Sequence, residues 1–72
     1  MGTKNAPGRF DCYNAADPDE PIFTLRASDP DAPMLVRFWA QWREQQGNTN
    51  PDKIAEARKC ADDMEAWRFN RA

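Results

Sequence analysis

The sequence contains no histidine among its 72 residues. Histidine is the most common general base in enzymes and the most common metal ligand in proteins. Its absence excludes Ser-His-Asp triads, Cys-His nucleophiles and zinc centres as these sites are usually built. Glycine is also scarce, with three residues and no phosphate-binding loop. The sequence therefore predicts a protein that is not an enzyme and that uses no cofactor or metal.

Long apolar runs and cysteine-rich motifs are missing as well. No stretch approaches the about 18 apolar residues of a membrane-spanning helix, and the first ten residues lack the apolar core of a secretory signal. We therefore expect a cytoplasmic protein without membrane contact. The two cysteines, Cys12 and Cys60, are expected to be free and mostly buried thiols, and a disulfide between them is the alternative.

The charge is small and unevenly distributed. The formal net charge is −2, and residues 10–34 hold six carboxylates against the single cation Arg26. Nucleic-acid-binding proteins are usually basic, so this balance argues against such a partner. The segment VRFWAQWR nevertheless interleaves arginine with tryptophan, which is a pattern of nucleic-acid surfaces. A small nucleic-acid-binding protein with an Arg/Trp helix surface therefore remains an alternative.

The first part of the chain predicts a flexible tail followed by a β-hairpin. Residues 1–8 are polar and rich in turn-forming residues, and we expect residues 9–72 to form a single small domain. The segment RFDCY at 9–13 is short and aromatic, and IFTLRA at 22–27 alternates apolar and polar residues with the period of a half-buried strand. The turn-forming residues between them favour a two-stranded antiparallel hairpin.

The second part of the chain predicts two helices. Leu35, Phe38, Trp39 and Trp42 recur at the spacing of an amphipathic helix, and Gly47 is placed to end it. A second helix is expected to begin with Asn50 as N-cap, Pro51 as its first residue and Asp52 in its first turn. The short connection implies an antiparallel helical hairpin, with Ala57 and Ala61 of the second helix interleaving with Phe38, Trp39 and Trp42. The predicted fold class is α+β, in the order ββαα.

A short acidic motif occurs twice, as DPDEP at 17–21 and as DPDAP at 29–33. Neither copy has the glycine of a calcium-binding EF-hand loop, and proline separates the first two carboxylates. The second copy fits the start of a helix, with Ser28 or Asp29 as N-cap and Pro33 in the first turn. The first copy fits the hairpin loop. Both copies are therefore interpreted as turn-forming segments rather than as a metal site.

Binding is the remaining class of function, because the first helix is apolar around more than one stripe. One interpretation places all of these side chains in the core. The other places part of them at a protein interface, where aromatic residues and arginine are enriched. The predicted interface residues are Arg37, Trp39, Trp42, Arg43, Trp67 and Arg68, with an acidic loop of Asp17, Asp19 and Glu20 as a second contact.

Four segments together resemble small uncharacterised proteins encoded in bacteriophage and prophage genomes: FDCY, DEPIFTLRASDPDAP, VRFWA and ARKCADDMEAWR. The resemblance covers about residues 9–69 and includes no catalytic signature. It implies an accessory protein inside a bacterium that acts by protein–protein binding and inhibits a host or defence protein. The partner is then a foreign protein or a second copy in a homodimer, and a purely structural homo-oligomer is a further alternative.

Overall fold

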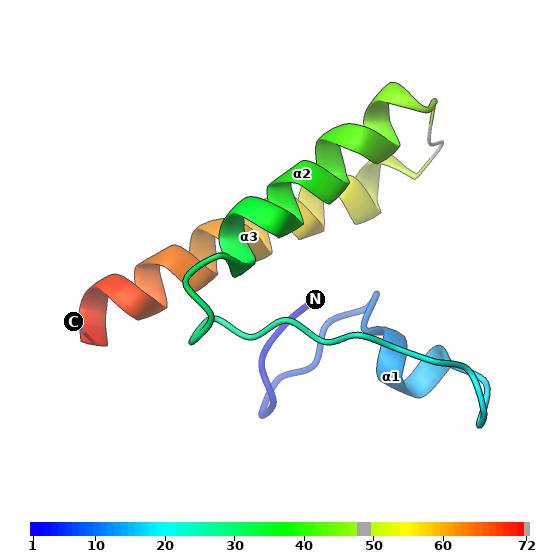
Figure 1. Ribbon diagram of the computed structural model, residues 1–72, viewed down its shortest axis with the longest axis horizontal. Coiled ribbons are helices and arrows are strands. Elements are labelled where there is room, and N and C mark those ends of the chain that lie inside the picture. The colour runs from blue at the N-terminus through cyan, green and yellow to red at the C-terminus, as the bar shows by residue number, and fades with distance from the viewer. Residues whose placement is uncertain (48–49, 72) are drawn as a thin grey trace.

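The computed structural model describes residues 1–47 and 50–71, and its order of elements is shown in Figure 1. Within these residues the chain forms α1 at Cys12–Ala15, α2 at Ala32–Gln45 and α3 at Pro51–Arg71. Helices α2 and α3 pack against each other and run in opposite directions, so the predicted helical hairpin is confirmed. Residues 48–49, in the predicted short connection, lie outside the described residues.

The inner ends of the two helices follow the predicted capping residues. Gly47 has a φ of 78°, the left-handed conformation that ends a helix at little cost for glycine. At the start of α3, the side-chain oxygen of Asn50 accepts a hydrogen bond from the amide of Lys53 at 3.1 Å. Pro51 is the first residue of α3 and Asp52 lies in its first turn. These predictions are therefore confirmed.

The N-cap of α2 lies later than predicted. Asp31, rather than Ser28 or Asp29, occupies the N-cap position, and its side chain makes no capping hydrogen bond. The side chain of Asp29 instead accepts a hydrogen bond from the amide of Asp31 at 2.9 Å, and its carbonyl accepts one from Ala32 at 3.1 Å. Asp29 thus forms an additional turn before the helix, while Pro33 lies in the first turn as expected.

The predicted β-hairpin is wrong, because the described residues contain no strand and the fold is all-helical rather than α+β. The Asp11 carboxylate accepts a hydrogen bond from the Gly8 amide at 2.7 Å, and the chain enters the single turn of α1 immediately afterwards. Residues 22–26 carry no regular structure, and the Phe23 side chain is 82% exposed. An alternating segment needs a paired neighbour to form a sheet, and a two-stranded ribbon is marginal even when both strands are available.

The contact between α2 and α3 is lined by small side chains. The buried apolar residues are Ala32, Ala40, Ile54, Ala57 and Ala61. Among the described residues, no large side chain is fully buried. Val36 and Trp39 of α2 pack against the cluster from its edge, together with Met1. The predicted interleaving is therefore confirmed for Trp39 but wrong for Phe38 and Trp42, which are exposed.

The beginning of the chain attaches to α3 through charged groups. The amino group of Met1 lies 2.5 Å from the Asp11 carboxylate and 2.7 Å from the Glu56 carboxylate. Gly8 lies so close to Met1 and Glu56 that a methyl group at this position would overlap with both. These contacts hold the segment before α1 against the middle of the helical hairpin.

A larger side chain between the helices should destabilise the fold. We expect Ala57→Leu to lower the free energy of unfolding by about 1–3 kcal/mol, because the added atoms must separate α2 from α3 or shift the Trp39 ring. Ala55→Leu is a matched control on the exposed side of the same helix and should change stability by less than about 0.5 kcal/mol. Urea denaturation followed by circular dichroism measures both, and equal losses would contradict the packing described above.

Candidate interaction surface

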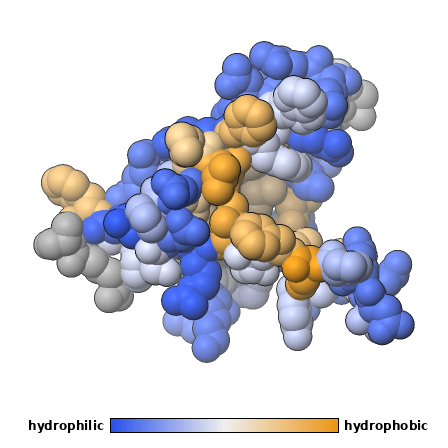
Figure 2. Space-filling model, in the orientation of Figure 1, coloured by the Kyte–Doolittle hydropathy of each residue, from blue (hydrophilic) through white to orange (hydrophobic). Residues whose placement is uncertain are grey.

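The side of α2 that faces away from α3 carries an exposed apolar surface. It is formed by Met34, Leu35, Phe38 and Trp42, which are 62%, 44%, 64% and 52% exposed. We call these four residues the outer face of α2. Figure 2 shows hydrophobic surface over α2. This surface extends toward the connection between α1 and α2, which lies below α2 in this view. Because Ala32 and Ala40 face α3, and Val36 and Trp39 pack at the edge of that contact, these four larger side chains are left on the opposite side.

Two aromatic rings of the outer face pack against each other. Phe38 and Trp42 lie one helical turn apart, with ring centroids separated by 6.3 Å and ring planes inclined by 16°. This offset-stacked arrangement holds both rings on the helix surface. The neighbouring positions Gln41 and Gln45 are also exposed, and both are uncharged. The middle of this helix face is therefore apolar, with polar but neutral amides beside it.

Trp39 differs from Trp42 because it belongs to the interior of the hairpin. Its ring is half-buried and packs on the buried cluster between α2 and α3. The Arg43 guanidinium lies 6.0 Å from the centre of this ring, and the Lys53 ammonium lies 5.7 Å from it. Both cations are at distances typical of cation–π contacts. Trp39, Arg43 and Lys53 thus form a contact within the chain.

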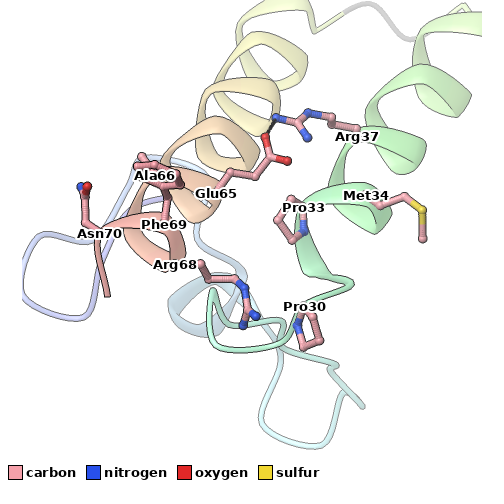
Figure 3. Close-up of a pocket in the computed structure, with 9 residues that line it drawn as sticks. All are labelled: Pro30, Pro33, Met34, Arg37, Glu65, Ala66, Arg68, Phe69 and Asn70. Carbon is pink, nitrogen blue, oxygen red and sulfur yellow. Dashed lines mark hydrogen bonds and ion pairs between the residues drawn. The ribbon is translucent and has the colours of Figure 1, made fainter. Parts of the chain in front are cut away.

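A groove of about 570 Å³ lies between the start of α2 and the end of α3, next to the outer face (Figure 3). Pro30, Pro33, Met34 and Phe69 supply its apolar lining. Across it, Arg37 reaches the carboxylate of Glu65. The groove is thus an open surface depression whose arginine already has an acidic partner in the same chain.

The arginines near this groove are engaged in contacts within the chain. Arg37 donates hydrogen bonds to Asp62 at 2.6 Å and to Glu65 at 2.5 Å. The bond from Arg37 lowers the pKa of the Glu65 carboxyl below its usual value. Arg68 donates a hydrogen bond to the carbonyl of Ser28 at 2.8 Å. These groups connect α2 and the turn before it to α3.

The six predicted interface residues do not form one surface. Trp42 alone belongs to the outer face. Arg37 and Arg68 bind groups of the same chain, Trp39 and Arg43 contact each other, and Trp67 is 44% exposed on α3. Met34, Leu35 and Phe38 were not among the predicted interface residues. They could have been found from Ala32, Val36 and Ala40, which are spaced by four residues. This series of smaller side chains indicates the side of α2 that packs against another helix, and the outer face lies on the other side.

The predicted acidic loop forms a compact turn. The Asp17 amide donates a hydrogen bond to the Glu20 side chain at 3.0 Å, and the Glu20 amide donates one to the Asp17 carbonyl at 3.1 Å. Asp17, Asp19 and Glu20 are all exposed. The turn lies in the long connection between α1 and α2. Its structure is explained by the local pairing of these residues.

Both cysteines are free thiols. Cys12 is exposed at the start of α1, so the expectation of two mostly buried thiols holds for only one of them. Cys60 is half-buried beside the hairpin, and burial raises the pKa of its thiol above the usual value. A raised pKa lowers the fraction of reactive thiolate at neutral pH.

Comparisons of the chain with protein-family models, with curated proteins and with solved structures found no match. Among residues 1–47 and 50–71, no group of three or more histidine, cysteine or acidic side chains is arranged to hold a metal ion. In the same part of the chain, no helix is sufficiently long and apolar to cross a membrane. Function is therefore inferred from the surface of the protein itself.

Two neighbouring tryptophans provide a test of this division into an inner and an outer side. We expect Trp39→Ala to lower the free energy of unfolding by about 2 kcal/mol or more, because it removes packing from the hairpin cluster. Trp42→Ala should cost less than about 1 kcal/mol, because its side chain is 52% exposed and lies outside the hairpin cluster. Thermal and urea denaturation of both variants measure the difference. A larger loss for Trp42→Ala would place the outer face in the core instead.

Acid should weaken the hairpin through two carboxylates. Arg37 lowers the pKa of Glu65, and hydrogen bonds from Arg58 lower the pKa of Glu44, both from a usual value of 4.5. Their contribution to stability is complete above that value and is lost as the pH falls through the lower pKa of the folded state. We expect the melting temperature to fall between roughly pH 5 and pH 2.

A charge-neutral variant isolates this effect. The double variant Glu44→Gln, Glu65→Gln should melt at a lower temperature than the wild type at neutral pH, and its melting temperature should depend less on acid. Because both pairs are exposed, added salt should reduce the difference between the two proteins. An unchanged acid dependence in the double variant would show that other groups control it.

Proposed function

We propose that the protein acts by binding another protein chain through the outer face of α2. The observation that carries this proposal is the grouping of four large apolar side chains on one helix face, each between 44% and 64% exposed. Single exposed apolar residues are common, but adjacent ones that form a patch mark interaction sites in small monomers. Aromatic residues and methionine are also the types enriched in the cores of protein interfaces.

The shape of the surface favours a macromolecular partner over a small ligand. The outer face is the convex side of a helix, and its Phe38 and Trp42 rings project from it. Small molecules bind in concave sites that bury most of their surface. A helix that presents apolar side chains one turn apart instead fits an apolar groove or another helix. Binding therefore requires a partner that supplies the complementary surface.

The proposed role is an accessory and non-catalytic one in the bacterial cytoplasm, as the resemblance to phage-encoded proteins implies. A host or defence protein bound to the outer face would have its own contact surface covered. A small binding protein can inhibit its target in this way. The chemistry this requires is burial of apolar surface. It needs no general base or metal ligand, and the sequence has no histidine to supply one.

The nucleic-acid alternative receives less support from the surface. Its phosphate contacts would have to come from arginine and lysine side chains. Arg37 and Arg58 are paired with carboxylates of the same chain, and Arg68 binds a carbonyl. Binding to phosphate would compete with these contacts.

Affinity capture from bacterial lysate tests the proposal with three forms of the protein. The outer-face variant is Phe38→Ser, Trp42→Ser, and the matched control is Tyr13→Ser, Phe23→Ser, which changes two aromatic residues that are 79% and 82% exposed elsewhere. After nuclease treatment, we expect the wild type and the control to retain the same protein in stoichiometric amount, and the outer-face variant to lose it. Circular dichroism checks that all three forms remain folded.

Two outcomes of this experiment would contradict the proposal. One is equal retention of the same protein by all three forms, which would place the binding surface elsewhere on the molecule. The other is recovery of nucleic acid from untreated lysate, with a yield that falls steeply with salt and does not depend on Phe38 and Trp42. That result would favour the nucleic-acid alternative.

A further inference from the structure

We propose that the outer face of α2 binds the outer face of a second copy, with the two α2 helices antiparallel about Phe38. This inference rests on the proposed use of the outer face as a protein-binding surface, and a foreign protein would compete with the second copy for it. Dimerisation would also bury large apolar side chains. In the single chain, none of the described large side chains is fully buried. In the dimer, α2 would be covered by α3 on one side and by the partner's α2 on the other.

The outer face is self-complementary when two copies of α2 lie antiparallel. Met34, Phe38 and Trp42 are spaced by four residues, so a two-fold axis at Phe38 places Met34 of one copy opposite Trp42 of the other. The two Phe38 rings then meet at the axis. Methionine sulfur packs favourably against aromatic rings, and aromatic rings pack favourably with each other.

Charge selects the antiparallel arrangement over the parallel one. Asp31 is exposed at the start of α2, on the side of the helix that carries Phe38, and Gln45 is exposed on the same side near the end. A parallel pair would place the two Asp31 carboxylates side by side. The antiparallel pair instead places each carboxylate near the Gln45 amide of the partner, which can donate a hydrogen bond to it. The helix dipoles also oppose each other in this arrangement.

The size of the surface is consistent with a reversible dimer. If each of the four side chains contributes on the order of 100 Å², two copies would bury about 800 Å² from these residues alone. Asp31, Gln41 and Gln45 at the edge bring the total to roughly 1,000 Å², the lower limit for a specific interface. The interface is therefore small, and the dimer is expected to dissociate on dilution.

Sedimentation velocity of the full chain over a range of concentrations tests the dimer. The wild type should change from 8.3 kDa toward twice this mass as the concentration rises. Phe38→Glu places two carboxylates at the two-fold axis and should weaken association by roughly 30-fold or more. Tyr13→Glu introduces the same charge at an exposed site on α1 and should behave as the wild type. Circular dichroism confirms that both variants keep their helices.

A wild type that stays at 8.3 kDa, or a Phe38→Glu variant that associates as strongly as the wild type, would overturn the inference. The capture experiment separates this failure from failure of the proposed function. If the wild type is a monomer but still retains a foreign protein through Phe38 and Trp42, only the second-copy inference is wrong. If the wild type is a monomer and retains nothing through these residues, both are wrong.

Cross-linking through introduced cysteines tests the register. In a background of Cys12→Ser and Cys60→Ser, Asp31→Cys and Gln45→Cys are prepared as two separate proteins. A mixture of the two should form a disulfide-linked dimer under a mild oxidant, whereas each protein alone should not. Efficient self-linking of the Asp31→Cys protein would overturn the antiparallel arrangement, because it requires the two helix starts to lie together.

Discussion

The close contact between α2 and α3 determines the arrangement of the remaining side chains. Ala40, Ala57 and Ala61 present only methyl groups there, and all three are fully buried. Such a contact brings the helices together without space for aromatic rings between them. Trp39 therefore covers the edge of the contact, and Phe38 and Trp42 lie on the outside. The exposed apolar surface is a direct consequence of how the hairpin packs.

Local signals in the sequence predicted the helical hairpin, whereas the predicted strands depended on residues far apart in the chain. Gly47, Asn50 and Pro51 act within one turn of the helix ends they define, so their effect could be read from a few neighbouring residues. A strand is stable only when another strand pairs with it. The alternation in residues 22–27 was present, but the pairing segment turned into α1 after Asp11, and the first half of the fold was predicted incorrectly.

The interaction surface was only partly predictable, for a different reason. Apolar spacing identified α2 as an amphipathic helix, but it did not decide which of its two apolar sides would meet α3. The spacing of Leu35, Phe38 and Trp42 suggested a buried side, and the hairpin instead buries the smaller side chains of Ala32 and Ala40. The buried side of α2 is the one whose small side chains pack closely against Ala57 and Ala61 of α3. The sequence of α2 alone cannot show this packing. Arg37 likewise pairs with carboxylates of α3, and Arg68 binds the Ser28 carbonyl, and spacing along one helix could not reveal either contact.

The bond between Arg68 and the Ser28 carbonyl has a mechanical consequence. The end of α3 extends past the beginning of α2 (Figure 1), and this bond attaches it to the turn that leads into α2. The same two segments form the walls of the groove beside Met34 and Phe69. A displacement of the last turns of α3 would therefore pull the turn at Ser28 with it. Arg68 thus links the two walls of the groove through one exposed hydrogen bond.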